Sequence, residues 1–555
     1  LGTQMIATRY VYGIDGTVWH IATWKEGERS EFGWIGLDAA TGKERRRLAS
    51  YVKEAITHHW TRCSGTNATV RYLITGNTMD FLDVRTGQHL RSSAARSSCQ
   101  FGVRVANGMV YTFPVDCGCF KSLRGVLGMA PQETPMPAPN VPPLVKGPAY
   151  GAVPNPKSPI PNPQSTWPCY RHDAARSGNS ATQVPEDFKS LWQVDVGGSP
   201  TAPTAGHGLV FVASQDTHQL AALDAKTGER RWKFIPGGPA DTPPTLDNGA
   251  AVFGCRNGWV YCLRAADGKL AWRYRVAPDE RRIIAFGRLE SPVPVYGSVV
   301  VANNVAYCSA GRTSELDGGI RVCALDVASG EALWHENIPR AELKKGARLD
   351  KRRLREQGAL GDILRSDGRY VYMRGWRFDL KTGAKKFYYN WKGGLRPSNK
   401  TGFLDASMKR PWSHRGVAGQ MLVASQTTTC GFMSLQKEGW QLAYFTLPDK
   451  GQYKIFARNF DAKGQPNKEK PGWTIEKCPI AAEAMAIAGS TLFVAGPPDE
   501  LEPEGGLLWA LSLADGRKLQ EFPLDSPPVF DGMAAADGRL YVSCKDGGLR
   551  CFGKK

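Results

Sequence analysis

Long apolar runs are missing from this sequence of 555 residues, and none is long enough to cross a membrane as a helix. The chain does not open with the charged and apolar regions of a secretory signal peptide. Because the first residue is Leu1 rather than Met, we expect a mature or partial product. Zinc-finger spacings and RRM-type aromatic motifs are also lacking, so nucleic acid is disfavoured as a partner.

Negative charge is in short supply, and the net charge is +19. Such a balance suits an anionic partner, such as a polysaccharide, an acidic lipid surface or an acidic protein. We expect the most basic run, Lys344–Arg355, to be a solvated face rather than a binding motif. The composition therefore leaves a protein partner or an anionic or polysaccharide ligand as the partner classes.

Cysteine is plentiful, with 13 residues, but the motifs that give it an assigned role are lacking. The sequence has no C-x-x-C-H haem motif and no paired C-x-x-C zinc spacing. The count favours an exported protein, periplasmic or at the cell surface. Six cysteines fall within strand patterns and predict small buried apolar residues: Cys255, Cys262, Cys308, Cys323, Cys544 and Cys551.

One group of cysteines lies close together in irregular sequence, just after two histidines. Two disulfides would pin the long loops of this region, whereas thiolates with or without histidine would hold a metal ion. Free thiols are the third alternative, and the spacing does not decide among the three. The group consists of Cys63, Cys99, Cys117 and Cys119.

A repeated sequence motif organises the chain, and its clearest copy is LAALDAKTGERRWKF at Leu220–Phe234. A short strand leads into an Asp-to-Gly turn and a second strand ends near Trp232. Related copies begin at Gly36, Phe81, Cys262, Cys323, Phe378 and Ala510. The late tryptophans, such as Trp272 and Trp334, predict packing between neighbouring sheets.

Four short strands per unit, at a spacing of about 40 residues, predict an all-β fold, a β-propeller of four-stranded antiparallel blades. We expect about seven or eight blades with Pro-rich and charged inserts. Residues 1–126 predict the first blades with Cys-rich loops, 127–168 a Pro-rich excursion within the ring, and 169–555 the remaining blades. Closure of the ring is left open, because it could need a preceding segment or another chain.

The repeat ALDAxTGxxxW resembles the PQQ-type propeller repeat of quinoprotein alcohol dehydrogenases and of the propeller subunit of the outer-membrane β-barrel assembly machinery. Stretches outside the repeat, such as Cys169–Gly178 and Gly402–Arg415, look like the C-terminal portion of large exported PQQ-like propellers of planctomycete-type bacteria. That resemblance implies export. It implies no particular reaction, because repeat residues build blades rather than sites.

Bound PQQ is disfavoured by the sequence. The family's lid over the quinone is a disulfide between adjacent cysteines, and here the nearest feature is Cys117-Gly-Cys119. We therefore assign no cofactor, apart from the possible metal ion at the cysteine group.

Polar residues between the strands form the other candidate site, because propeller loops on one face converge at the centre of the ring. Carboxylate, His and Arg side chains at that place would suit general acid–base catalysis on an anionic or sugar-like ligand, or binding of such a ligand. Each residue could instead cap a turn or pair locally. The catalytic candidates are His172, Asp173, Asp405 and His414. The ligand-binding candidates are Arg171, Glu290, Arg312, Asp317, Arg374, Arg415 and Asp531.

The sequence favours an exported propeller that acts as a binding or assembly scaffold and not as an enzyme. The alternative is an enzyme with its site in the central funnel, either a quinoprotein-like oxidoreductase or a polysaccharide-processing enzyme. The repeat supports the first role, and the polar loop residues support the second.

Overall fold

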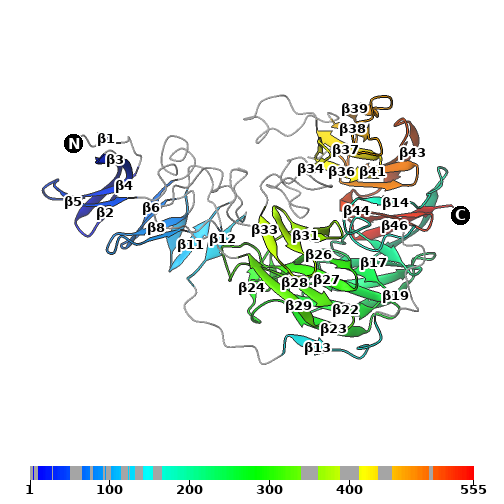
Figure 1. Cartoon of the computed structure of the whole chain (residues 1–555), viewed down its shortest axis with the longest axis horizontal. Helices are drawn as coiled ribbons and strands as arrows, with labels where there is room; N and C mark the ends of the chain where they lie inside the picture. Colours follow the sequence, from blue (N-terminus) through cyan, green and yellow to red (C-terminus); the bar gives the residue numbers. More distant parts are fainter. Residues whose placement is uncertain are drawn as a thin grey trace. The chain divides into compact units, whose positions relative to one another are not determined.

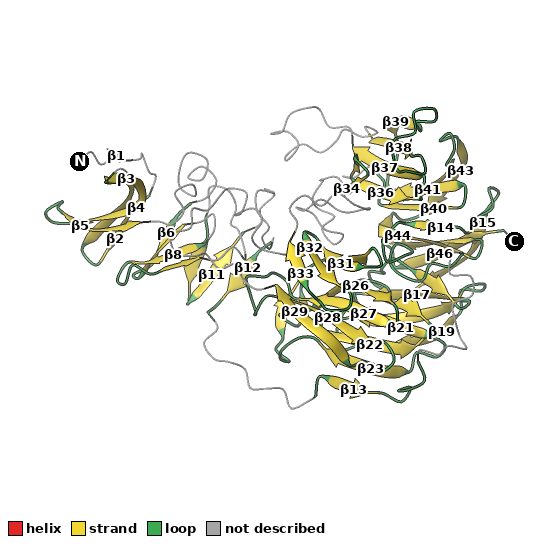
Figure 2. Ribbon diagram, viewed as in Figure 1, coloured by secondary structure: helices red, strands yellow, loops and turns green. Residues whose placement is uncertain are grey.

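A computed structural model gives the arrangement of the chain. It describes residues 4–5, 10–27, 29–49, 65–75, 79–91, 94, 102–113, 123, 125–131, 142–153, 165–338, 361–387, 412–434, 453–498 and 504–554. Those residues form strands and loops and contain no helix, as Figure 2 shows. No helix capable of spanning a membrane is therefore found among them. The charged segment 341–360 lies outside the described residues, as do the four cysteines Cys63, Cys99, Cys117 and Cys119.

The chain divides into two compact units. The first comprises Leu1–Pro137 with Arg312–Gly319 and Pro339–Leu360, and the second comprises Ala138–Gly311, Ile320–Ile338 and Gly361–Lys555. The prediction of one ring that includes residues 1–126 stays a prediction. Residues 1–137 group in the first unit, and residues 144–146 pair with a strand of the second unit.

The described residues of the first unit form three antiparallel sheets. The first contains β1 (Gln4–Met5), β2 (Val11–Ile14), β3 (Thr17–Glu26), β4 (Arg29–Asp38) and β5 (Glu44–Ala49). The second contains β6 (Asn67–Ala68), β7 (Tyr72–Thr75), β8 (Asp80–Asp83) and β9 (His89–Arg91). The third contains β10 (Arg104–Ala106), β11 (Met109–Thr112) and β12 (Leu127–Met129).

Seven sheets follow one another among the described residues of the second unit, and we call them blades A to G (Figure 1). Each is built on four strands, and two of them carry a further short strand. Blade A has β16 (Thr204–Gly206), β17 (Leu209–Ser214), β18 (Gln219–Asp224) and β19 (Arg230–Phe234). Blade B has β20 (Thr245–Asp247), β21 (Ala250–Gly254), β22 (Trp259–Arg264) and β23 (Leu270–Arg275). Blade C has β26 (Val295–Ala302), β27 (Val305–Ala310), β28 (Ile320–Asp326) and β29 (Ala332–Ile338).

The remaining blades repeat this order. Blade D has β30 (Arg365–Ser366), β31 (Tyr370–Met373), β32 (Trp376–Asp379) and β33 (Lys385–Phe387). Blade E has β36 (Met421–Ala424), β37 (Thr428–Ser434), β38 (Tyr453–Asn459) and β39 (Thr474–Cys478). Blade F has β40 (Ala484–Ala488), β41 (Thr491–Gly496), β42 (Gly506–Ser512) and β43 (Lys518–Leu524). Blade G has β44 (Pro528–Ala536), β45 (Arg539–Cys544), β46 (Gly548–Gly553) and β15 (Lys189–Asp195).

Blade G joins sequence from both ends of the second unit. Its outer strand β15 precedes blade A in the chain and pairs antiparallel with β46, the last strand. The core that blade G shares with blades A and F includes Phe188, Tyr541 and Phe552. This chain thus supplies the strand that completes its last blade and covers the edge of β46. The predicted propeller of four-stranded antiparallel blades is confirmed.

Two short strands extend existing blades and two hairpins stand apart. Strand β13 (Leu144–Lys146) pairs with β23 of blade B, and β14 (Asn179–Ser180) runs parallel to β40 of blade F. The hairpins are β24 (Ile283–Ala285) with β25 (Arg288–Glu290), and β34 (Trp412–His414) with β35 (Val417–Gly419).

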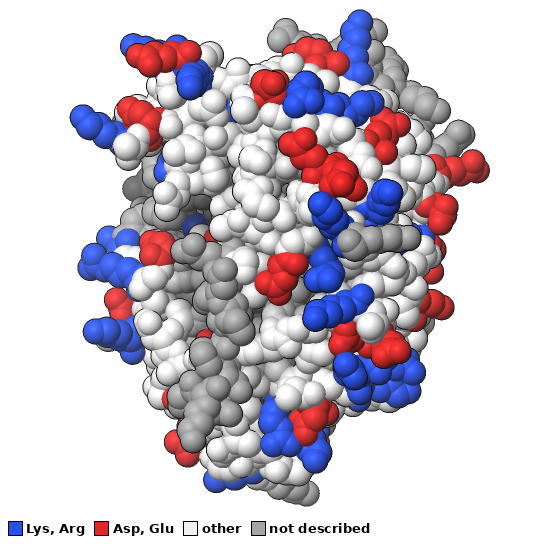
Figure 3. Space-filling model, turned by 90° about the vertical axis from the view of Figure 1, so that its right-hand side faces the viewer, with Lys and Arg blue, Asp and Glu red and all other residues white. Residues whose placement is uncertain are grey.

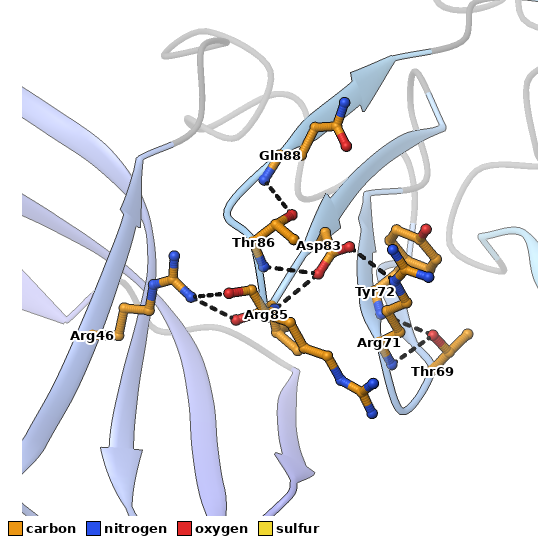
Figure 4. Close-up of polar contacts among 9 residues, drawn as sticks. Arg46, Thr69, Arg71, Tyr72, Asp83, Arg85, Thr86 and Gln88 are labelled. Carbon is orange, nitrogen blue, oxygen red and sulfur yellow. Dashed lines mark hydrogen bonds and ion pairs between the residues drawn. The ribbon is translucent and has the colours of Figure 1, made fainter.

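The repeated Asp-to-Gly turn has the same geometry in both units. In Figure 4, the Asp83 carboxylate accepts hydrogen bonds from the backbone N–H groups of Arg85 (2.8 Å) and Thr86 (3.1 Å). Asp224 does the same with Lys226 (2.8 Å) and Thr227 (3.0 Å) in blade A. The Asp thus holds the backbone in the turn that brings the next strand back.

The late tryptophans pack between neighbouring blades, as the sequence predicted. The Trp232 indole of blade A donates to the Ala265 carbonyl in the blade B turn at 2.9 Å. At Gly268 of that turn, a Cβ atom would lie 2.6 Å from the Trp232 ring, and φ is +71°. Glycine is therefore required twice, by the left-handed backbone and by the indole against it. The same pairing joins Trp192 to Gly228, Trp272 to Gly330, Trp334 to Gly383 and Trp473 to Gly516.

Candidate functional site

The centre of the second unit's ring is occupied by one stretch of chain, residues 167–180, which we call the central segment. It bonds to the innermost strand of every blade. Its contacts from blade A to blade G are Trp167 with Ala205, Pro168 with Leu246, Arg176 with Ser298, Ala174 with Ser366, Ser177 with Ala424, Gly178 with Ile487, and Arg171 with Asp531. A ring of seven blades is thus bridged across its middle by a segment of fourteen residues.

An ion pair between Arg171 and Asp531 lies at the core of this arrangement. The two side chains are 3% and 1% exposed, and the Tyr170 hydroxyl donates to the second oxygen of the Asp531 carboxylate. The Arg171 guanidinium also donates to the Leu422 carbonyl and lies 4.3 Å from the centre of the Trp412 ring. Both charges are satisfied within the protein, so a ligand could engage either only by opening the pair.

Arg176 is a second buried arginine of the central segment, and the sequence analysis did not single it out. Its guanidinium donates to the carbonyls of Tyr170 (2.9 Å), Leu364 (2.9 Å) and Ser298 (3.3 Å). It therefore joins blades C and D to the centre. The motif CYRHDAARSG contains this residue, but a sequence does not show which of its arginines is buried.

Backbone strain is concentrated in the central segment. Arg171, His172 and Arg176 have φ values of 57°, 76° and 63°, in the left-handed region that residues other than glycine seldom adopt. Such conformations persist only where the surroundings hold them. Here the hydrogen bonds to the blades provide that support.

Three of the four predicted catalytic residues line one cavity of about 680 Å³. His172 and Asp173 come from the central segment, and His414 comes from β34. The other polar side chains of the lining are Ser177, Asn179, Ser425, Gln426 and Thr427. The prediction that loops from different parts of the chain meet here is consistent with this arrangement. Asp405 lies outside the described residues.

The two histidines of the cavity have different surroundings. His172 Nδ1 lies 3.6 Å from the Asp173 carboxylate, and its ring packs edge-on against Trp167. The pKa of Asp173 is lowered because His172 and Ser177 stabilise the carboxylate more than burial penalises it. His414 Nδ1 lies 2.6 Å from the Thr429 hydroxyl, and burial together with the nearby Arg415 lowers the pKa of His414 to about 4. The cavity therefore presents a neutral imidazole beside a carboxylate–imidazole pair at pH 7.

Glu290, a predicted ligand-binding residue, belongs to a second cluster of buried charges. Arg256 donates to the Glu290 carboxylate at 2.9 Å and lies 3.4 Å from the Asp241 carboxylate. Burial raises the pKa of Asp241, against the opposing effect of Arg256. Arg256 was missed by the sequence analysis, because its two partners lie 15 and 34 residues away.

The remaining predicted ligand-binding residues do not line the cavity with the histidines. Arg374 lies 3.7 Å from Asp362, and both are buried. Arg415 is exposed at the β34–β35 turn and donates to the Gln426 carbonyl. Arg312 and Asp317 lie in the loop between β27 and β28, which groups with the first unit.

A larger cavity of about 940 Å³ lies against the turns of blades A, B and G. Its charged side chains are mainly paired with one another, Arg231 with Asp224 at 2.8 Å and Arg264 with Asp267 at 2.5 Å. On the face of the molecule in Figure 3, basic and acidic side chains are likewise interspersed. Neither feature is the uniform basic surface that nucleic acid requires.

A metal centre is not found among the described residues, where no three His, Cys, Asp or Glu side chains gather in a suitable cluster. The predicted cysteine site (Cys63, Cys99, Cys117 and Cys119) lies in the part of the chain that the structure does not describe.

Residues 185–371 match the sequence model of a family described as outer membrane protein assembly factor BamB. This match begins just before β15 and runs through the first repeats. Over these residues the chain is similar to PQQ-like β-propeller repeat proteins. It is 26% identical over 158 residues to BamB of Yersinia pestis, covering 27% of this chain and 37% of that protein.

A second relative is the quinohemoprotein alcohol dehydrogenase ADH-IIG of Pseudomonas putida. It is 22% identical over 423 residues, which cover 60% of this chain and 58% of the dehydrogenase. The chain thus spans less than two thirds of the length of either relative.

Solved structures from both groups also match. The quinohemoprotein alcohol dehydrogenase of Comamonas testosteroni matches over 70% of this chain and 81% of its own, with 15% identity and a TM-score of 0.38. BamB of Moraxella catarrhalis matches over 66% of this chain and 100% of its own, with 12% identity and a TM-score of 0.33.

Proposed function

We propose that this chain is an exported PQQ-like propeller that acts as a binding or assembly scaffold and holds no PQQ. The observation that carries the proposal is the central segment, which occupies the middle of the ring and bonds to all seven blades. A flat quinone needs an indole face to stack on and free carboxylates for its Ca²⁺. Here the Trp412 face is covered by Arg171, and Asp531 already pairs with Arg171. The residues at the centre therefore do not fit the cofactor.

The comparisons support an assembly role and an exported location. The family matched by residues 185–371 is described as an outer membrane protein assembly factor. The stretches outside the repeat resemble exported propellers of planctomycete-type bacteria. Since the chain spans 37% of BamB of Yersinia pestis, the role of that protein comes to this chain as part of the proposal.

An exposed apolar hairpin supports a protein partner. In the β24–β25 hairpin, Ile284, Phe286 and Leu289 are 80%, 73% and 63% exposed. Large apolar side chains gathered at one exposed hairpin mark protein interaction sites more often than isolated ones do.

The absence of PQQ is tested by titrating purified full-length chain with PQQ in the presence of Ca²⁺. We expect no saturable binding and no quinone absorption retained after gel filtration. Stoichiometric retention of the quinone would contradict the proposal. An Arg171→Ala variant serves as the comparison, because it uncovers the Trp412 face.

The scaffold role is tested by crosslinking in the producing cells, with the double variant Ile284→Ser/Phe286→Ser. We expect a stoichiometric protein partner that this variant loses. Ile235→Ser is the matched control, since Ile235 is 64% exposed on a different loop. Equal recovery of a partner with the wild type, the double variant and Ile235→Ser would show that the hairpin is not the binding site. A chain that crosslinks to no partner in any of the three would contradict the scaffold role.

A small-ligand site in the His172 cavity is the second candidate function. Its support is the 680 Å³ volume, within the range of ligand pockets, and a lining rich in hydroxyl, amide and imidazole groups. Those groups suit a polyhydroxylated ligand such as a saccharide. The test is a thermal-shift screen with neutral and acidic oligosaccharides, in which His172→Ala abolishes any shift. A shift that survives in both His172→Ala and His414→Ala would place the ligand elsewhere.

A further inference from the structure

Two buried cysteines of blade C face each other across neighbouring strands. Cys308 on β27 and Cys323 on β28 are directly opposite in the antiparallel register. Their sulfurs lie 3.0 Å apart, and the side chains are 2% and 0% exposed. The sequence analysis treated both residues as small apolar core residues, which their burial alone would support. Burial alone does not explain why the two sulfurs lie in direct contact.

We propose that Cys308 and Cys323 form a cross-strand disulfide in the mature protein. Directly opposed residues of an antiparallel pair have Cα atoms about 4.5–5.5 Å apart, within the span that a disulfide bridges. The bond itself is about 2.05 Å long, so the sulfurs need to approach by about 1 Å, which small rotations of the two side chains provide. No backbone movement is needed.

The surroundings of Cys323 favour the thiolate, which is the reactive form of the thiol. His335 on β29 is opposite Cys323 in the register, and its Nε2 lies 3.1 Å from the Tyr274 hydroxyl. The hydrogen bond with Cys308 lowers the pKa of Cys323 against the opposing effect of burial, and His335 lowers it further. The pKa of Cys308 is raised correspondingly by its hydrogen bond with Cys323 and by burial.

The oxidant is an external disulfide, either of a small thiol or of a thiol-exchange protein. The Cys323 thiolate attacks one sulfur of that disulfide and expels the first thiolate, which leaves a mixed disulfide on Cys323. Cys308 loses its proton and attacks the Cys323 sulfur, expelling the second thiolate. The two cysteines lose two protons and two electrons in all, and the external disulfide is reduced to two thiols.

The burial of the two cysteines determines at which stage the disulfide exchange can occur. Cys308 and Cys323 lie in one core with side chains of blade B such as Val260 and Trp272. An external disulfide cannot reach them once these blades have packed. The exchange therefore takes place during folding, when β28 has paired with β27 and β29 but blade C has not yet packed on blade B. The cross-link closes the stem of the hairpin that carries the Gly311–Gly319 loop, and it stabilises blade C by restricting the unfolded chain.

The inference goes beyond the proposed function and does not depend on it. The full chain is produced in an oxidising compartment, or refolded with glutathione disulfide, and alkylated during denaturation without reductant. We expect a cross-linked peptide containing Cys308 and Cys323, two hydrogens lighter than the two thiols. Cys430 is the internal control, because Val423 and Ala457 lie opposite it in its sheet. It should be fully alkylated.

A second measurement separates the bond from a chance contact. Reductant should lower the unfolding temperature of the wild-type chain and leave that of Cys308→Ala/Cys323→Ala unchanged. Complete alkylation of both cysteines in the oxidised wild-type chain would overturn the proposal, as would their cross-linking to other cysteines. The peptide map decides the question even if the double variant fails to fold.

Discussion

The repeated turns and the central segment join the blades of the second unit in opposite ways. Each turn contacts one neighbouring blade, through an indole that packs on a glycine and donates to a carbonyl. The central segment occurs once and contacts all seven innermost strands. The repeats therefore encode each blade interface locally, whereas a sequence without a repeat holds the ring across its middle.

The same comparison extends to the first unit, where the partner of the turn changes. Arg46 takes the position of the tryptophan and donates to the carbonyls of Val84 (2.9 Å) and Arg85 (2.8 Å), as Figure 4 shows. A Cβ at Gly87 would lie 3.0 Å from the end of the flexible Arg46 side chain. The turn geometry is thus kept while the side chain packed against it is exchanged.

Breaking the central segment should have the largest effect. Arg171→Ala leaves the Asp531 carboxylate buried without its charge partner, which we expect to cost about 3–5 kcal/mol of unfolding free energy. Denaturant unfolding followed by tryptophan fluorescence measures the change.

The control is the double variant Arg171→Ala/Asp531→Ala. It should cost less than the sum of the two single variants, because neither charge is left alone. A cost below about 1 kcal/mol for Arg171→Ala would mean that the pair is not buried in the native ring.

Substitution at a turn should have a smaller effect, confined to one blade interface. Gly268→Ala places a Cβ 2.6 Å from the Trp232 ring at a φ of +71°, and we expect a loss of about 2–4 kcal/mol. Gly208→Ala is the matched control, since its φ is +72° and no atom lies within 4 Å of the added Cβ. It should cost about 1 kcal/mol. Equal losses in the two variants would show that the tryptophan does not pack on the turn.

The smallest effect concerns His414 beside the central segment. Its pKa is lowered to about 4, so between that value and the usual value near 6.5 the unfolded chain binds a proton that the folded chain does not. His414 therefore removes stability as the pH falls from about 6.5 to about 4. His414→Gln should lose less stability than the wild type between pH 7 and pH 5, by denaturant midpoint. Identical losses would show that the imidazole is not desolvated.

The sequence predicts the features that depend on neighbouring residues. The Asp-to-Gly turns, the four-stranded blades and the inter-blade tryptophans all follow from a motif of about 15 residues that recurs along the chain. The sequence also singled out His172, Asp173 and His414, which line one cavity, but it did not show that the first two lie in a segment that contacts every blade.

What the sequence could not predict are pairings over long distances. Arg171 and Asp531 are 360 residues apart, and nothing in either stretch shows that they satisfy one another rather than a ligand. The roles of Arg176 and Arg256 were missed for the same reason. The contact between Cys308 and Cys323 depends on the register of two strands separated by an inserted loop, which a strand pattern does not fix.

Hydrogen exchange of the central segment tests the account most directly. If residues 167–180 are part of the ring's core, peptides covering them should exchange as slowly as those of β22, Trp259–Arg264, and open only with the second unit. The exposed turn residues Lys226, Thr227 and Glu229 provide the fast reference. Exchange of the central segment as fast as that turn would show an open centre, and would contradict a ring held together by its own chain.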